Sequence, residues 1–521
     1  MFFITVILQG IFRLFSAASD TVSYDITVGS YTQKGNAGIE FFNVQPETGK
    51  TVKTNEIKNN NASFICFSPD KKFMYAVHEE GSASALLSAY KKNSTGKYEI
   101  LNTETVKGSA ACHVNYNPQN ATVYVANYMG GSISVFKTFN GKLLPISQYI
   151  EYPGKGANTS RQEKSHAHNV MLSPDFHYLY VSDLGTDHVH RHKIYADGLV
   201  DENYVNIQID PGNGPRHLIF NDDGTKAYLI NELKGIIDVF NVGEKGFEKI
   251  QSIVADTSKS NKDRGSADIH LSPNGKWLIS SNRVTCNDLA VFSVLSDGSL
   301  KAALHQPVGI RPRNFSFSPD GKFVFVACQD DDKVQIFSFN NTTGQLNDMH
   351  RDISVKMPVY VNVQASSNEI DANERIQSLG IQLTKPSSPI ANYVKVSQTG
   401  NLVYVSGHGP ELPNGDFVKG KLGKDLTVEQ GQDAARRVGI SMLSTLANYL
   451  GDLNRVKKIV KVLGFVNSDP AFTDQPLVLN GFSNLMVDVF GARGKHARSA
   501  IGTNTLPRGM AVEVEMVLEV E

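Results

Sequence analysis

The hydrophobic residues in the first two-thirds of the chain fall into short runs that recur about every 50 residues. Each copy has a strand-like apolar segment, a turn of the Ser-Pro-Asp-Gly type and a second strand rich in aromatic residues. The six copies are FSPDKKFMYAVHE around Pro69, YNPQNATVYVANY around Pro118, LSPDFHYLYVSDL around Pro174, FNDDGTKAYLINE around Asp222, LSPNGKWLISSNR around Pro273 and FSPDGKFVFVACQ around Pro319. Strands and turns repeated at this period predict a β-propeller.

A further blade is predicted from the two ends of this region. The segment ITVGSYTQKGNAGIEFFNV at 26–44 supplies strands before the first repeat. A late strand near 355–363 is expected to complete their blade and close the ring. We therefore predict a seven-bladed, all-β propeller over residues 24–363, with six or eight blades as the alternatives.

The pattern changes after residue 363, and we expect a second domain of a different class. Residues 364–377 are polar and partly helical, and they are expected to form a linker. Apolar residues recur at helical spacing in 427–450 and 476–490, but alternate in 402–406, 456–466 and 511–520. Helices interleaved with strands predict an α+β domain over residues 378–521.

Polar residues gather at one end of the predicted propeller hairpins. A residue five or six before a turn and one ten after it lie at the same end of a hairpin. The positions before the turns are Ser63, His113, His168, Asn169, Arg216, His217, Asp268, Arg313 and Asn314, and those after them are Glu79, Tyr128, Asp183, Glu232, Arg283 and Gln329. A ring of Arg, His and Glu is typical of a functional site. The alternative for any single residue is hydrogen bonding at a strand end.

The overall composition narrows the classes of partner. The formal net charge is −1, which gives no electrostatic argument for nucleic acid or an anionic membrane as a partner. The histidines of DHVHRH at 187–192 would share one face of a strand, but alternating histidines also suit an exposed sheet face, and we predict no metal. Residues 1–20 are apolar and form a candidate signal peptide or N-terminal extension, so secretion is the alternative to a cytoplasmic location.

Residues 25–350 resemble the lactonase family of seven-bladed propellers. The resemblance is carried by VGSYT at 28–32, ACHVNYNP at 111–118, HAHNVMLSPD at 166–175, GPRHLIF at 214–220, YLINE at 228–232 and RPRNFSFSPDG at 311–321. The family includes a 6-phosphogluconolactonase and a carboxy-muconate lactonizing enzyme. The resemblance also implies the cytoplasmic location.

The resemblance implies a lactone hydrolase that needs no cofactor, with 6-phosphogluconolactone as the expected substrate. The implied catalytic residues are His168, Arg216, Glu232 and Arg283, and the expected substrate-binding residues are Glu79, His113, His166, His217 and Arg313. His168 or Glu232 is the candidate base, while Arg216 and Arg283 are expected to hold a phosphate or carboxylate. The alternatives are a carboxy-muconate-type lactonizing reaction and a binding platform without catalysis.

Residues from about 372 to 521 resemble the Rid/YjgF enamine/imine deaminase family, whose fold is similar to chorismate mutase. The matching segments include SPIANYVKV at 388–396, LVYVSGHGP at 402–410, HARSAIGTNTLP at 496–507 and AVEVE at 511–515. By resemblance Arg498 would bind a substrate carboxylate, and Glu513 and Tyr393 would line the pocket. The family also implies a homotrimer with pockets between subunits.

Overall fold

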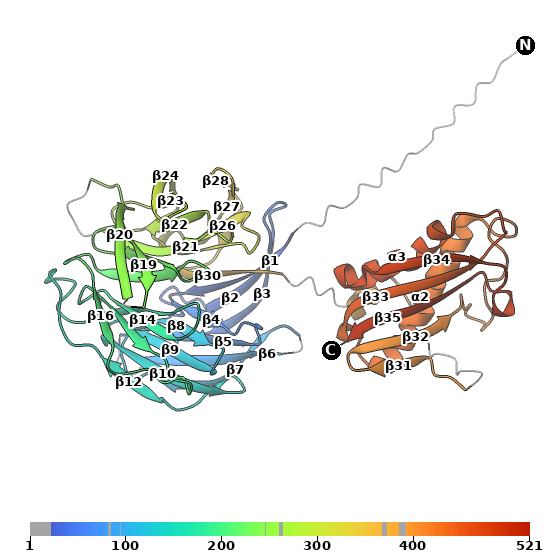
Figure 1. Ribbon diagram of the computed structural model, residues 1–521, viewed down its shortest axis with the longest axis horizontal. Helices are drawn as coiled ribbons and strands as arrows, with labels where there is room; N and C mark the ends of the chain where they lie inside the picture. Colours follow the sequence, from blue (N-terminus) through green and yellow to red (C-terminus); the bar gives the residue numbers. More distant parts are fainter. Residues whose placement is uncertain are drawn as a thin grey trace, which may run out of the picture. The chain divides into compact units, whose positions relative to one another are not determined.

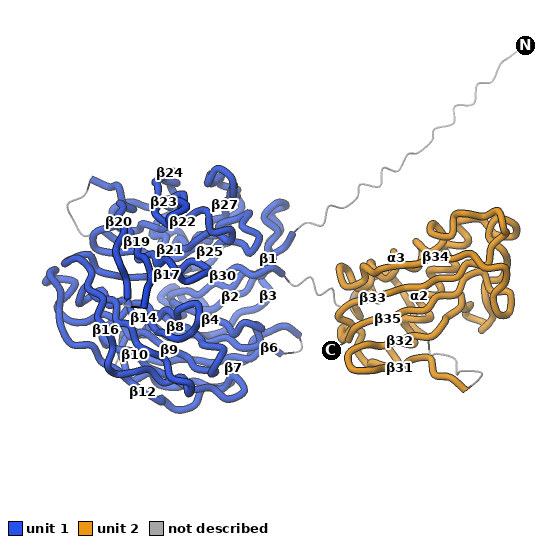
Figure 2. The backbone as a smooth tube through the Cα atoms, in the orientation of Figure 1, with its two compact units in different colours: residues 1–366 blue, residues 367–521 orange. Residues whose placement is uncertain are grey.

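The computed structural model describes residues 22–520 except 82–84, 94, 245, 260–263, 367–371 and 385–391. The chain divides into two compact units, Met1–Ser366 and Ser367–Glu521 (Figure 2). The candidate signal segment at 1–20 lies outside the described residues. Over the described part of the chain, no helix combines the length and the apolar character needed to cross a membrane.

Unit 1 is the predicted propeller with seven blades. Within the described residues its strands form seven sheets of four or five strands each (Figure 1). The first blade is closed by the two ends of the unit, because β30 (Pro358–Ala365) pairs antiparallel with β1 (Tyr24–Ser30). The late strand expected near 355–363 is thereby confirmed.

Each blade is an antiparallel meander whose first strand lies nearest the axis, except that β30 takes this place in blade 1. Blade 1 also contains β2 (Gly38–Gln45) and β3 (Lys50–Lys58), and blade 2 contains β4 (Ile65–Phe67), β5 (Phe73–His78), β6 (Leu86–Lys92) and β7 (Tyr98–Thr105). Blade 3 contains β8 (Ala111–Asn117), β9 (Thr122–Asn127), β10 (Ser132–Phe139), β11 (Lys142–Leu143) and β12 (Gln148–Glu151). Blade 4 contains β13 (Ala167–Leu172), β14 (Tyr178–Asp183), β15 (His188–Lys193) and β16 (Val205–Gln208). Blade 5 contains β17 (Pro215–Phe220), β18 (Lys226–Asn231), β19 (Ile236–Gly243) and β20 (Gly246–Val254). Blade 6 contains β21 (Ser266–Leu271), β22 (Trp277–Asn282), β23 (Asp288–Val294) and β24 (Leu300–Pro307). Blade 7 contains β25 (Pro312–Phe317), β26 (Phe323–Cys328), the 3-10 turn η1 (Gln329–Asp331), β27 (Lys333–Phe339), β28 (Leu346–Asp348) and β29 (Ile353–Ser354).

The serine of the turn motif stabilises four of the inner hairpins. In blade 2, Ser68 Oγ donates to Asp70 Oδ1 (2.6 Å) and accepts from the Phe73 amide (2.9 Å). The same two bonds recur at Ser173, Ser272 and Ser318, with Asn274 in place of the aspartate in blade 6. The side chain thus satisfies backbone groups that the turn leaves unpaired.

Unit 2 has one mixed sheet covered on one face by two helices (Figure 1). The sheet order is β31-β32-β35-β33-β34, and only β33 and β34 run parallel. Its elements are α1 (Ala372–Ser378), β31 (Val396–Thr399), β32 (Leu402–His408), α2 (Val428–Leu450), η2 (Leu453–Arg455), β33 (Val456–Asn467), α3 (Gln475–Phe490), η3 (Gly491–Gly494), β34 (Ala497–Thr503), η4 (Pro507–Gly509) and β35 (Val512–Val520).

The sequence places the main elements of unit 2 within a few residues. Helix α2 begins after Thr427, which forms a capping box with Gln430. The Thr427 side chain accepts a hydrogen bond from the Gln430 amide, and the Gln430 side chain accepts one from the Thr427 amide. In β35 the alternate residues Val514, Met516 and Leu518 are buried in the core beneath the helices.

The segment expected as a linker is divided between the two units. Residues 364 and 365 belong to β30 of the propeller. Helix α1 belongs to unit 2, because Ala372 and Ile376 lie one helical turn apart and are both buried in the core of that unit. Residues 367–371 lie outside the described residues.

Candidate active site

Most inner strands of the propeller carry a β-bulge near their first residue. The pairing shifts between Ala111 and His113, Ala167 and Asn169, Pro215 and His217, Ser266 and Ile269, and Pro312 and Asn314. These shifts leave Cys112, His168, Arg216, Asp268 and Arg313 without a directly paired residue. A bulge redirects its extra side chain and is common beside active sites. The consecutive residues Arg216 and His217 consequently contact each other, although neighbours in a regular strand face opposite ways.

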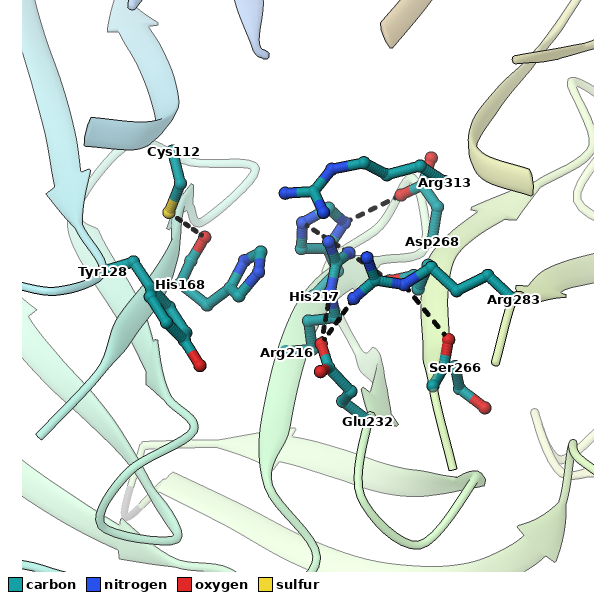
Figure 3. Close-up of polar contacts among 12 residues, drawn as sticks. Cys112, Tyr128, His168, Arg216, His217, Glu232, Ser266, Asp268, Arg283 and Arg313 are labelled. Atoms are coloured by element: carbon teal, nitrogen blue, oxygen red, sulfur yellow. Dashed lines mark hydrogen bonds and ion pairs between the residues drawn. The ribbon is translucent and has the colours of Figure 1, made fainter. Parts of the chain in front are cut away.

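Glu232 is the centre of a buried cluster of charges (Figure 3). Its Oε2 accepts from Arg216 Nε (2.9 Å) and Arg283 Nη2 (3.0 Å), and its Oε1 accepts from Arg161 Nη2 (2.7 Å). Burial opposes ionisation of this carboxyl group, but Arg283, Arg216 and Arg161 outweigh it and lower the pKa of Glu232 to about 2. Glu232 is therefore a carboxylate at neutral pH and a weak base.

The guanidinium groups beside Glu232 are held in fixed positions. Arg216 is 2% exposed and also donates to the Ala267 carbonyl (2.5 Å), while Arg283 Nε donates to the Gly265 carbonyl (3.2 Å). Burial lowers the pKa of Arg283 to about 9, which leaves it charged at neutral pH. The site thus offers two preorganised cations to an anionic group.

A second ion pair lies beside the first. Arg313 Nη2 is 3.5 Å from Glu79 Oε2, and Glu79 Oε1 accepts from Tyr31 Oη at 3.1 Å. The guanidinium carbon of Arg313 also lies 5.4 Å from the centre of the Tyr31 ring. Glu79 and Arg313, both expected in the ring from the repeat, are brought together, and Tyr31 joins them from outside the repeat.

His217 and Asp268 hold Arg216 from the other side. His217 Nδ1 is 2.8 Å from Asp268 Oδ1, and its Nε2 is 3.2 Å from Arg216 Nη1. Burial and the charge of Arg216 lower the pKa of His217 to about 4. His217 is therefore neutral, donates from Nδ1 to Asp268 and accepts from Arg216 at Nε2. The other oxygen of Asp268 pairs with His270 (2.8 Å).

His168 faces this cationic cluster and differs from the other ring histidines (Figure 3). Its ring centre lies 5.3 Å from that of His217 and 5.4 Å from that of Tyr128. Among the described residues, its buried Nδ1 has no hydrogen-bond partner. Burial first, and then the charge of Arg216, hold the pKa of His168 well below 6.5. His168 thus presents a neutral imidazole with an unsatisfied nitrogen.

Two other predicted site histidines are bound within the scaffold. His166 Nδ1 is 3.1 Å from the Tyr128 carbonyl oxygen, and its Nε2 is 3.0 Å from Glu163 Oε1. His113 Nε2 lies 2.9 Å from Asn169 Nδ2. His113 also lines a cavity of about 480 Å³ whose lining includes the turn residues Pro69 and Pro319, while its ring centre lies 5.5 Å from that of His217.

Arg161, like Tyr31, is a site residue that the sequence pattern missed. It lies in the connection between β12 and β13, outside the repeated hairpin, and its Nη2 also lies 3.3 Å from Tyr128 Oη. Its only signal in the sequence is its position in RQEKSHAH, shortly before His166 and His168.

The alternating histidines of β15 occupy a different environment from the exposed sheet face considered above. His190 and His192 are buried, and the His190 ring stacks on Tyr152 with 4.1 Å between ring centres. His190 binds Asp183 and Asn206, and His192 binds Tyr152 Oη (2.7 Å). Within the described residues no group of three or more His, Cys, Asp or Glu side chains is placed to hold a metal ion.

The structure places Arg498 and Glu513 on opposite faces of the unit 2 sheet. Arg498 pairs with Val462, which in turn pairs with the buried Met516 on the helix-covered face. Glu513 pairs with Phe465, three residues from Val462 and therefore on the open face. The two side chains do not form one site within a chain.

Arg498 is bound to the helix that covers it. Its Nη1 donates to Ser483 Oγ (3.0 Å) and Asn480 Oδ1 (3.2 Å), and its Nη2 donates to the Pro476 carbonyl (3.1 Å). Burial and the neighbouring Glu515 raise the pKa of Glu513. Tyr393 lies before β31 and is half exposed.

Comparison with known proteins supports both units. Residues 25–363 match the family model described as lactonase, seven-bladed β-propeller, and residues 373–519 match the YjgF/chorismate mutase-like model. A protein of Formosa agariphila named 6-phosphogluconolactonase is 32% identical over 63% of this chain and 96% of its own length.

Two solved structures are similar to the propeller. One from Bacteroides fragilis is 37% identical with a TM-score of 0.62, covering 67% of this chain and 99% of that chain. The other, a periplasmic gluconolactonase of Pseudomonas aeruginosa, is 28% identical with a TM-score of 0.61, covering 66% of this chain and 99% of that chain. The chain therefore belongs to the lactonase family of seven-bladed β-propellers, and it carries a second domain of the YjgF/chorismate mutase-like family.

Proposed function

We propose that unit 1 hydrolyses 6-phosphogluconolactone to 6-phosphogluconate, with His168 as the general base. The observation that carries the proposal is the neutral imidazole of His168, with its unsatisfied Nδ1, facing buried arginines. The name of the Formosa agariphila relative supports the choice of substrate.

The reaction needs a base, cationic groups and a proton donor, and the site supplies each. His168 takes a proton from water while the water oxygen bonds to the lactone carbonyl carbon. Arg216 and Arg283 stabilise the oxyanion that forms on the carbonyl oxygen. The bond from the carbonyl carbon to the ring oxygen then breaks, and the proton on His168 passes to that oxygen.

Glu232 acts in this proposal as a positioning residue. Its low pKa makes it a poor proton acceptor, whereas its Oε2 accepts one hydrogen bond from each of Arg216 and Arg283 and so holds both guanidinium groups in place. Between the two candidate bases that the sequence offers, these surroundings favour His168 over Glu232.

Hydrolysis of 6-phosphogluconolactone by the purified chain tests the proposal. The enzyme should accelerate hydrolysis far above the spontaneous rate at neutral pH. His168→Gln should lower the enzymatic rate at least ~100-fold, which is roughly the contribution of a general base. His177→Gln is the matched control, because His177 is exposed in the turn after β13. No acceleration by the wild-type chain would overturn the proposal.

The alternatives predict other outcomes in the same assay. A lactonizing enzyme would interconvert carboxy-muconate and its lactone and leave the sugar lactone untouched. A binding platform without catalysis would bind 6-phosphogluconate and accelerate neither reaction.

For unit 2, we propose assembly into a homotrimer through the open face of its sheet. That face carries Tyr404, Leu463 and Val517, which line a cavity of about 260 Å³ together with Lys461 and Glu515. The implied action on enamines or imines would need a pocket completed by a neighbouring subunit, since Arg498 and Glu513 lie on opposite faces.

A further inference from the structure

Arg161 is the third guanidinium on a carboxylate that is already paired twice. Arg216 and Arg283 both donate to Oε2 of Glu232, and Arg161 donates to Oε1. One carboxylate carries one negative charge, so two buried arginines satisfy its charge without a third. The pair between Arg161 and Glu232 is therefore the one that can break without leaving a buried charge alone.

Exposure separates Arg161 from its two neighbours. Its side chain is 36% exposed, compared with 2% for Arg216 and 13% for Arg283. An ion pair in contact with water contributes little free energy, because water screens it and solvates the separated partners. Arg161 can thus exchange Glu232 for another anion at small cost.

Hydrogen bonds hold the backbone around Arg161 in place, so its side chain starts from a fixed point beside the site. The amides of Arg161 and Gln162 both donate to the Asn158 carbonyl, at 3.2 and 2.7 Å. Gln162 is fully buried, and its Nε2 donates to the Leu184 carbonyl at 2.8 Å. A substrate group that enters beside Tyr128 therefore meets the guanidinium of Arg161, which lies 3.3 Å from Tyr128 Oη.

The site as a whole carries an excess of positive charge. Four guanidinium groups (Arg161, Arg216, Arg283 and Arg313) face the two glutamates Glu232 and Glu79. Asp268 pairs with His270, and its charge raises the pKa of His270 despite burial. The four guanidinium groups outnumber the three carboxylates of Glu232, Glu79 and Asp268, and a phosphate monoester supplies nearly two negative charges at pH 7.

We infer that Arg161 is a specificity-determining residue that leaves Glu232 and binds the phosphate of the substrate. The site then selects phosphorylated sugar lactones over neutral ones. The inference rests on the proposed lactone hydrolysis, since it names the residue that recognises one part of that substrate. A planar guanidinium fork can donate two parallel hydrogen bonds to phosphate oxygens.

The test compares 6-phosphogluconolactone with glucono-1,5-lactone in Arg161→Gln. The ratio of kcat/KM for the phosphorylated over the neutral lactone should fall about 10- to 100-fold, the range for a lost hydrogen bond between charged groups, mainly through KM. Arg161→Lys keeps the charge without the fork and should recover part of the ratio. The matched control is Lys164→Gln, because Lys164 lies in the same connection but donates to the Met129 carbonyl.

An equal loss on both lactones would overturn the inference, because Arg161 would then serve only to hold Glu232. An unchanged ratio would overturn it as well. Calorimetric binding of 6-phosphogluconate and gluconate separates this inference from the proposed reaction. If the wild-type chain hydrolyses neither lactone but prefers 6-phosphogluconate, and Arg161→Gln loses that preference, the inference stands and the reaction falls. If the chain hydrolyses neither lactone and has no preference in binding, both fall.

Discussion

Arg216 and Arg498 both lie in motifs that assign them an anionic ligand, and the structure gives them different surroundings. Arg216 is 2% exposed and contacts Glu232 and His217, which come from the same blade, while Arg283 reaches Glu232 from the next blade. Arg498, in strand β34, donates three hydrogen bonds to helix α3 and lies on the opposite sheet face from Glu513. One unit gathers its candidate residues, and the other separates them.

The cause of this difference is the geometry of the two folds. In a propeller the inner strand of every blade ends near the same axis, so residues far apart in sequence converge. In a single sheet, alternate residues point to opposite faces, so a polar residue can lie either on the helix-covered face or on the open face. A motif therefore locates a site more securely on the propeller than on the sheet of unit 2.

The largest expected difference between the two units is the effect of alanine substitution at these two arginines on lactone turnover. Arg216→Ala should lower lactone turnover at least ~100-fold, because it removes a preorganised cation from a buried site. Arg498→Ala should leave lactone turnover at the wild-type rate, since Arg498 belongs to the other unit. The measurement is kcat/KM with 6-phosphogluconolactone, with circular dichroism melting to confirm that both variants fold.

Two results would contradict this expectation. Near-normal turnover of a folded Arg216→Ala would remove the residue from the reaction. A large loss in Arg498→Ala would mean that the two units act on one substrate.

The pH profile of turnover tests whether burial and the neighbouring arginines lower the pKa of His168. Activity requires the neutral imidazole, and burial together with Arg216 holds its pKa well below 6.5. With glucono-1,5-lactone, which has no titrating group, kcat/KM should therefore stay level as the pH falls through 6.5 and decline only at lower pH. A midpoint near 6.5 in wild type, absent in His168→Gln, would show an ordinary histidine.

The repeat in the sequence predicts the blades and most of the ring, but not its detailed geometry. His168 and Arg216 could be placed because they keep a constant distance from each turn. The bulges could not be read from the sequence, because they depend on the pairing of neighbouring strands. Without them the choice between His166 and His168 stays open, since strand alternation alone does not decide which ring enters the site.

Residues outside the repeat were beyond the reach of periodicity. Arg161 lies in a connection that has no counterpart in the other blades as a motif, so no periodic position marks it. In unit 2 the sequence predicts the helices and strands well. It could not predict the face on which Arg498 lies, because that depends on the register between β33 and β34.

The open face of the unit 2 sheet offers a smaller effect, in the state of assembly. Light scattering of the full-length chain should give about three times the 57.1 kDa chain mass if this face forms the proposed trimer. Val517→Asp should reduce the mass to that of one chain, because it places a carboxylate in the contact. The matched control is Leu477→Asp, an exposed apolar residue on α3, which should keep the wild-type mass. A wild-type chain that is monomeric at micromolar concentration contradicts the trimer.

The smallest expected effect tests whether Arg498 and Glu513 lie on opposite faces of the sheet. The protein used is the fragment 367–521 with Val517→Asp, because this substitution removes any contribution of assembly to the free energy of unfolding. Arg498→Ala and Ser483→Ala remove two ends of one hydrogen bond of 3.0 Å. Their effects on the free energy of unfolding should therefore be coupled by about 0.5–1 kcal/mol in a double-mutant cycle. Arg498→Ala and Glu513→Gln lie on opposite faces, so their effects should add within about 0.3–0.5 kcal/mol. Urea unfolding followed by circular dichroism measures both cycles. Strong coupling between Arg498 and Glu513 would place them in one pocket, and the contrast between the gathered ring of the propeller and the divided sheet of unit 2 would no longer hold.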